Sequence, residues 1–124
     1  MADTFQLQLV SPERVLVDEQ VTEAQIPAKD GFIGVLPGHA PLMSELKPGG
    51  VLSYHAGGKQ KVLAVFGGFV EVLQDRVRVL ADNAQHKEEI DVEDAKAVLA
   101  KATNAADLDE MMRAQARVDA ALIP

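Results

Sequence analysis

The chain has 124 residues, of which 48% are hydrophobic and 4% aromatic, and it contains neither Cys nor Trp. This length suits one domain, or one domain with an appendage, and the lack of Cys excludes disulfides, thiolate metal sites and thiol catalysis. The formal net charge of −7 argues against nucleic acid or an anionic membrane as a direct partner, because both attract basic patches.

Residues 4 to about 84 show the pattern of an all-β domain. Phe5, Leu7 and Leu9 alternate with polar neighbours, which is the period of a strand with one buried face. Pro12 and Pro27 follow apolar runs and are expected to end strands. The expected strands are 4–9, 15–17, 21–26, 51–55, 60–66, 69–73 and 77–81. Short strands at this spacing predict an antiparallel sandwich or barrel.

Glycines mark two features of this β region. Gly57 and Gly58 lie between two apolar runs and predict a hairpin, because such tight turns need the positive φ that Gly adopts readily. Gly67 and Gly68 interrupt a longer apolar run, which predicts a bulge or a close approach of two backbones. A second hairpin is expected at 74–76.

The segment from Asp30 to Leu42 combines three Gly and two Pro with several large apolar side chains. A solvated linker would not keep that much apolar surface, and a buried strand would not tolerate that much Pro and Gly. We therefore expect a shaped loop that presents apolar side chains to a partner.

The pattern changes to two helices in residues 85–124. Asp91 is a suitable N-cap, and apolar residues follow it at helical spacing. We expect the first helix to break at Thr103 and Asn104, and a second to start at 106–107. The second helix is expected to carry an apolar stripe of Leu108, Met111, Met112, Val118 and Leu122. These small-residue helices cannot stand alone, so the hairpin must dock on the β domain or on a partner, or alternate between the two.

No set of residues points to catalysis or to a metal site. The three His residues lie far apart in the sequence, and none is paired at helical spacing. Arg113 and Arg117 share one helix face and allow two interpretations. They form either an anion or phosphate site, or ion pairs with Asp109, Glu110 or acids of the first helix. We expect a non-catalytic protein without a metal.

Taken together, five segments in order resemble the epsilon subunit of the F-type ATP synthase. They are Leu9–Glu13, Gly34–Leu42, Leu46–Gly49, Gly67–Val72 and Val79–Ala84. The resemblance implies an antiparallel β-sandwich at 1–84 followed by an antiparallel two-helix hairpin at 85–124. It also implies a non-catalytic central-stalk subunit that couples rotation to ATP synthesis and restrains ATP hydrolysis through its C-terminal helices.

The same resemblance implies partners and a location. The partners are the gamma subunit, the c-ring and, through the helices, the alpha and beta subunits, with no nucleic acid and no direct membrane insertion. The location is peripheral, on the cytoplasmic side of the inner (plasma) membrane. The implied c-ring interface is Gly31, Phe32, Ile33 and Gly34. The implied gamma interface is Pro37, Gly38, His39, Ala40, Pro41 and Leu42.

Some bacterial members of this family bind ATP through an Ile/Leu-Asp-x-x-Arg-Ala motif. The residues at matching positions are Ile90, Asp91, Ala95, Arg113 and Arg117. Asp94, however, stands where the motif has Arg, and Gln85 stands where the family has Glu. Because Asp94 places a negative charge where a phosphate partner is expected, we hypothesise that ATP binding is weak or absent and that the chain needs no cofactor.

A second functional class is a stand-alone β-sandwich module that binds a small ligand or carbohydrate. Such modules use exposed aromatic side chains. Tyr54 is the only Tyr, and Trp is absent, so the composition disfavours this alternative. The N-terminal residues Met1–Phe5 contain no basic region and no apolar run, so we expect no signal peptide.

Overall fold

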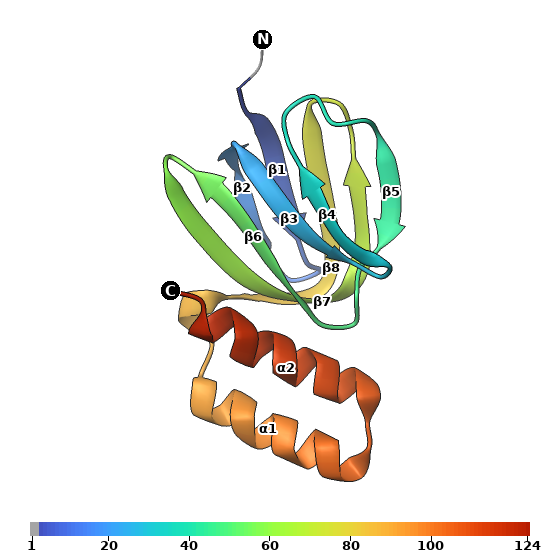
Figure 1. Ribbon diagram of the computed structural model, residues 1–124, viewed down its shortest axis with the longest axis vertical. Coiled ribbons are helices and arrows are strands. Elements are labelled where there is room, and N and C mark those ends of the chain that lie inside the picture. The colour runs from blue at the N-terminus through green and yellow to red at the C-terminus, as the bar shows by residue number, and fades with distance from the viewer. Residues whose placement is uncertain (1–2) are drawn as a thin grey trace.

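The computed structural model describes residues 3–124 and shows a β-sandwich followed by two helices, as the sequence predicted (Figure 1). Met1 and Ala2, at the start of the segment expected to lack a signal peptide, lie outside the described residues. The strands are β1 (Phe5–Val10), β2 (Val15–Val21), β3 (Glu23–Ala28), β4 (Gly31–Val35), β5 (Leu42–Glu45), β6 (Gly50–Ala56), β7 (Lys59–Val72) and β8 (Arg76–His86).

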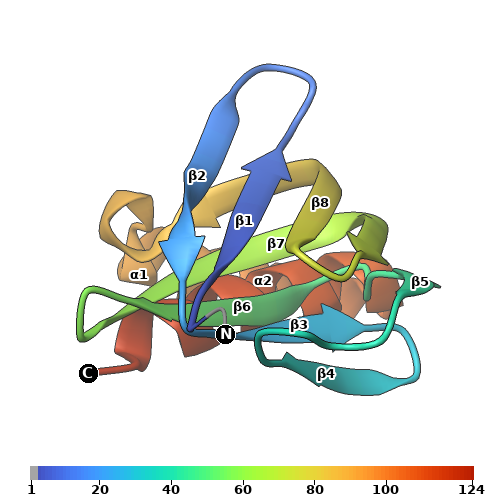
Figure 2. The same cartoon turned by 90° about the horizontal axis from the view of Figure 1, so that it is seen from above.

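The strands form one hydrogen-bonded sheet that folds over into two layers (Figure 2). The order is β2-β1-β8-β7-β6-β3-β4, and β5 pairs separately with β7. All pairs are antiparallel except β1 and β8, which run parallel. Both predicted hairpins are present, β6 with β7 and β7 with β8. Strand β8 extends to His86, two residues past the expected division of the chain.

Strand β7 changes layer at Gly67 and Gly68. Before these glycines Leu63 and Val65 face the main core, and after them Val70 and Val72 do, so the core-facing positions change from odd to even. A Cβ on Gly68 would overlap the carbonyl of Leu80 in β8. The pairing register with β8 is the same on both sides, so the predicted close backbone approach is confirmed and no bulge forms.

The segment before β6 forms backbone hydrogen bonds with β7 at the point where β7 changes layer. The Leu46 N–H donates to the Gly68 carbonyl over 2.9 Å, and the Gly67 N–H donates to the Lys47 carbonyl over 3.0 Å. Both glycines have positive φ, 73° and 119°, which a side chain would oppose. Along one edge, β7 therefore pairs with β6 before the two glycines and with β5 after them.

The main core lies between the two layers and consists of aliphatic side chains with little aromatic content. The alternation at the N-terminus is confirmed, since Phe5, Leu7 and Leu9 are all buried. Tyr54 is also buried, and its hydroxyl donates to the Glu19 carboxylate over 2.8 Å. Burial and this hydrogen bond raise the pKa of Tyr54.

A short 3₁₀ turn at Lys87–Glu89 leads into α1 (Val92–Ala105) and α2 (Leu108–Leu122). The predicted cap is confirmed, because the Asp91 carboxylate accepts from the Asp94 N–H over 3.1 Å. The predicted break at Thr103 and Asn104 is wrong. The Thr103 hydroxyl donates to the Leu99 carbonyl within the helix, and the chain turns only at Ala106, which has a φ of 55°.

Several strand predictions are also wrong. Val21 ends β2 instead of beginning the next strand, and the segments 60–66 and 69–73 belong to the single strand β7. Gly31–Val35 forms β4 rather than a loop, with Ile33 and Val35 facing inward and Phe32 and Gly34 facing out. Strand β4 lies at the edge of the sheet and pairs only with β3 there, so Gly31 and Gly34 weaken the hydrogen bonding of a single strand pair.

Strand β3 also continues through Pro27. Strand β6 pairs with β3 only up to Gln25, so the missing N–H of Pro27 breaks no bond there.

Helix α2 packs on β6 and β7, and α1 lies on the far side of α2 (Figure 1). The contact is formed largely by Ala and Val side chains. One buried cluster joins Ala116, Val118 and Ala120 of α2 to Val62, Ala64 and Phe66 of β7, together with Ile90 and Ala95. Leu108 and Leu122, which were expected in the apolar stripe, are exposed instead. The backbone of α2 lies directly against Gly49, where a Cβ would overlap the Met112 carbonyl and lie 2.6 Å from the Arg113 Cα.

The substitution Gly49→Ala should therefore loosen the hairpin selectively. The added methyl group collides with helix backbone, which cannot rotate away, and overpacking of this kind costs about 1–3 kcal/mol. Hydrogen exchange should show faster exchange of α1 and α2 amides while the strands keep their protection. In the control Gly34→Ala, the added Cβ meets only the flexible end of Gln25 at 3.2 Å. Equal exchange of the helices in both variants would contradict this account.

Candidate functional site

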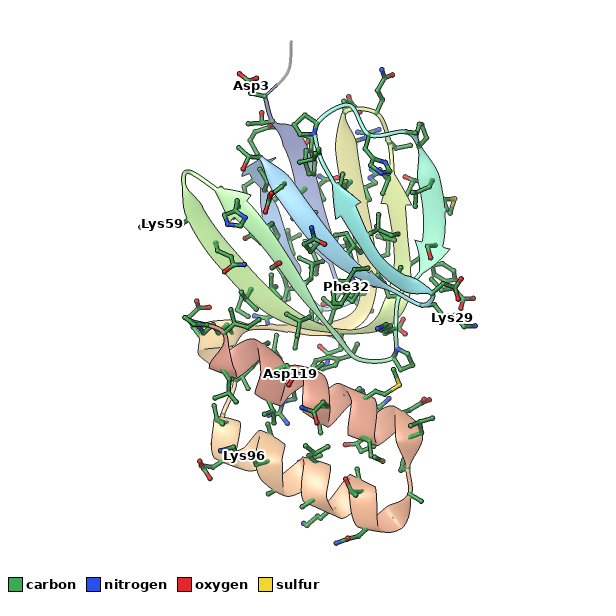
Figure 3. All side chains as sticks on the ribbon, viewed as in Figure 1. Asp3, Lys29, Phe32, Lys59, Lys96 and Asp119 are labelled. Carbon is green, nitrogen blue, oxygen red and sulfur yellow. The ribbon has the colours of Figure 1, made fainter. Side chains whose placement is uncertain are left out.

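The predicted c-ring segment forms the outward face of β4. Phe32 is exposed on this strand, and the ammonium group of Lys47 lies 5.4 Å from the centre of its ring. Figure 3 shows Phe32 and Lys29 on the hairpin of β3 and β4. Ile33 packs against the core, and Gly31 and Gly34 present backbone only. Phe32 is thus the one large side chain that this segment offers to a partner.

The predicted gamma segment is a loop built on a tight turn. The His39 N–H donates to the Leu36 carbonyl over 3.1 Å, with Pro37 and Gly38 at the two central positions. Gly38 has a φ of 82°, as the third residue of a type II turn requires. The His39 ring Nδ1 lies 2.7 Å from the Ala40 carbonyl. The loop therefore holds one shape, and it leads through Pro41 and Leu42 into β5.

An open cleft of about 380 Å³ lies where the sandwich meets the helices, and we call it the junction cleft. Its walls include Arg14, Gln85, Glu110, Arg113 and Arg117. The polar side chains come from the end of β8, from the turn before β2 and from α2. Two of the predicted nucleotide residues, Arg113 and Arg117, therefore lie on one wall of the same cleft.

Both arginines are paired with groups of the chain itself. The Arg117 guanidinium donates to the Asp94 carboxylate over 3.0 Å and to the Gln85 side-chain carbonyl over 2.9 Å. Arg113 pairs with Glu110 over 2.7 Å, which raises the pKa of Arg113. Of the two interpretations left open by the sequence, the structure shows the ion pairs. Nucleotide binding by these residues stays a prediction.

The other three predicted nucleotide residues have structural roles. Ile90 is buried in the core cluster between the helices and β7, and Ala95 is fully buried in the same cluster. Asp91 caps α1. Folding therefore explains all three without a ligand.

One link between sandwich and hairpin was not visible in the sequence. Arg14 donates both arms of its guanidinium to the Glu89 carboxylate, over 2.8 and 2.9 Å. The same carboxylate accepts from the His86 N–H over 2.9 Å. These bonds lower the pKa of Glu89 from 4.5 to about 2. Because 75 residues separate Arg14 from Glu89, no local pattern predicts the pair.

The sandwich also carries an exposed apolar surface that was not predicted from the sequence. Met43, Phe69 and Leu80 are exposed on the neighbouring strands β5, β7 and β8. A signal was present, because Phe69 and Leu80 each lie beside valines that face the core, so strand alternation turns both outward.

Two negative findings concern the part of the chain that the structure describes, residues 3–124. There, no group of three or more His, Cys, Asp or Glu side chains is placed to hold a metal ion. No helix in that range combines the length and apolar character that crossing a membrane requires.

Comparison with known proteins identifies relatives across most of the chain. A sequence profile of the family described as "ATP synthase, Delta/Epsilon chain, beta-sandwich domain" matches residues 4–87. The ATP synthase epsilon chain of Solibacter usitatus is 57% identical over 99 residues, which are 80% of this chain and 73% of that protein. The ATP synthase epsilon chain of Koribacter versatilis is 49% identical over 92 residues, 74% of this chain and 64% of that protein.

A solved structure is similar over almost the whole length. It is a chain in the Euglena gracilis mitochondrial ATP synthase, described as OSCP/F1/c-ring in rotational state 1. The TM-score is 0.76 and the identity 30%, and the match covers 98% of this chain and 77% of the other. The helical hairpin is therefore included in the similarity, beyond the residues that the family profile matches.

The lowered pKa of Glu89 predicts a specific pH dependence of stability. Because this pKa is lower in the folded chain than in the unfolded chain, the Arg14 pair stabilises the fold fully above about pH 4.5. The contribution is lost as the pH falls towards about 2. In urea unfolding, the chain should exceed the variant Glu89→Gln in stability at pH 6, and the gap should close by pH 2.

Both side chains of this pair are partly exposed, so solvent screens it and added salt should narrow the gap at pH 6. Glu93→Gln is the matched control, because Glu93 is exposed and forms no ion pair within residues 3–124. A gap at pH 6 that is the same for both variants would contradict the assignment.

Proposed function

The chain belongs to the ATP synthase delta/epsilon family, and on that premise we propose that it is a non-catalytic subunit of the central stalk. In this role it couples rotation of the stalk to ATP synthesis. The observation that supports the proposal most is the match of sandwich and hairpin together to one chain of an ATP synthase. The subunit lies at the periphery of the membrane, on its cytoplasmic side, as part of the complex.

We assign the two predicted surfaces of the sandwich to two partners. The outward face of β4, at Gly31–Gly34, contacts the c-ring mainly through Phe32. The turn and loop from Pro37 to Leu42 contact the gamma subunit. A loop already held by Pro37 and the Gly38 turn loses little conformational entropy when it binds. This rigidity suits a part that must transmit torque between two partners.

The hairpin is assigned to contact with the alpha and beta subunits and to restraint of ATP hydrolysis. Its attachment to the sandwich supports this role. Apolar side chains, mostly Ala and Val, form the contact, and the polar link from α2 is Arg117 with Gln85 at the end of β8. A partner that binds the released hairpin better than the docked hairpin would shift the equilibrium between the two states.

ATP hydrolysis by the reconstituted catalytic head tests this function. The full chain is compared with a version that ends at Glu89, which keeps all of β8 and the partner of Arg14. We expect truncation to raise hydrolysis several-fold while binding to gamma persists. Unchanged hydrolysis would limit the hairpin to a structural role. If neither version bound the head, the stalk assignment itself would be wrong.

A separate prediction concerns ATP. Asp94 and Gln85 already engage Arg117, so a phosphate group would have to displace both and approach the Asp94 carboxylate. Isothermal titration of the isolated chain should therefore show no saturable binding at millimolar ATP. The double variant Asp94→Arg with Gln85→Glu restores the family pattern and should bind more tightly than the parent chain. Saturable binding by the parent would refute the hypothesis.

A further inference from the structure

A groove of about 330 Å³ is lined by both helices and by the segment before β6, and we call it the hairpin groove. Its apolar side chains come from the two helices and are Leu99, Leu108, Met111, Met112 and Ala116. The rest of its wall is formed by Lys47, Gly49, Gln115 and Asp119, the last of which is labelled in Figure 3. The hairpin groove shares no residue with the junction cleft, so it is a separate feature.

Met111 and Met112 bring two thioethers to this groove. Both side chains are half-buried, and Met112 lies where the backbone of α2 meets Gly49. Met112 also lies one turn before Ala116, which is buried in the cluster that joins α2 to β7. The pair is therefore placed at the contact between hairpin and sandwich, whereas Met43, which is 70% exposed on β5, lies outside the groove.

Thioethers are the groups of this chain that a peroxide oxidises most readily. The chain contains neither Cys nor Trp, so no thiol competes for the oxidant. A lone pair of the sulfur attacks one oxygen of hydrogen peroxide, the O–O bond breaks, and a sulfoxide and one water molecule form. The sulfur loses two electrons and the peroxide gains them. The product is polar, and methionine sulfoxide reductases return it to the thioether.

The docked hairpin leaves few hydrogen-bond donors for a sulfoxide oxygen in the groove. The Gln115 amide donates to the Asp119 carboxylate over 2.8 Å, and that carboxylate can only accept. Among the described residues of the lining, Lys47 is the only cation, and its ammonium group lies 5.4 Å from the centre of the Phe32 ring. Because a polar oxygen without a donor loses free energy when it leaves water, oxidation favours the state in which the groove is open to water.

We propose that Met111 and Met112 form an oxidation site, and that methionine sulfoxide at this site releases the hairpin from the sandwich. The oxidised side chains bind water, which separates α2 from Gly49. Release in turn exposes both thioethers, so release and oxidation favour each other. The inference goes beyond the proposed function and is tested without it, because the isolated chain carries the whole site.

The test treats the isolated full-length chain with hydrogen peroxide and then removes the excess with catalase. Peptide mass mapping counts the oxygens added at each methionine, and hydrogen exchange reports the protection of the helices. We expect the α1 and α2 amides of chains oxidised at Met111 and Met112 to exchange about tenfold faster or more, while β1 and β8 keep their protection. Methionine sulfoxide reductase should restore the slow exchange.

Two variants locate the effect. The double variant Met111→Leu with Met112→Leu keeps the apolar volume and removes both sulfurs. Its helices should exchange as slowly after peroxide as before, although Met43 is oxidised. Met43→Leu is the matched control, because it removes an exposed thioether that lies outside the groove. Its helices should respond to peroxide as those of the parent chain do.

Three results would overturn the inference. The first is a parent chain oxidised at both Met111 and Met112 whose helices exchange as before. The second is oxidation at Met43 without oxidation at Met111 or Met112, because the groove would then shield its thioethers. The third is faster exchange of the helices in the double variant after peroxide. The first two results come from the parent chain, so they stand even if the double variant does not fold. None of them concerns binding to gamma or to the c-ring, so the proposed function is tested separately.

Discussion

The change of layer at Gly67 and Gly68 is the constraint on which the rest of the structure depends. It lets β7 pair with β6 in one half and with β5 in the other, and so joins the two layers in one sheet. A side chain at Gly68 would meet the β8 backbone. Without this close approach the strand could not exchange its core-facing side, and Val70 and Val72 would not reach the core.

The same change gives β7 two different outer surfaces. Before the glycines its outer side chains, Val62, Ala64 and Phe66, are covered by α2. Beyond them the outer position is Phe69, which is 52% exposed. Strand β7 thus carries the hairpin on one half and an exposed aromatic side chain on the other.

The parts of the fold that the sequence predicts are those encoded by local chemistry. The alternation of Phe5, Leu7 and Leu9, the hairpin glycines and the Asp91 cap each involve residues close in the chain. Strand β4 was missed because its glycines and the following Pro37 hid the inward alternation of Ile33 and Val35. Pairs such as Arg14 with Glu89 depend on how distant segments meet, which no local pattern contains.

The departures from the family's nucleotide motif have a common physical meaning. Asp94 and Gln85 are the two residues that differ from the pattern, and both bind Arg117 in the structure. The Arg117 guanidinium, which could otherwise pair with a phosphate group, pairs instead with side chains of the same chain. The contacts of Arg117 with Gln85 at the end of β8 and with Asp94 on α1 are therefore made within the chain and need no bound ligand.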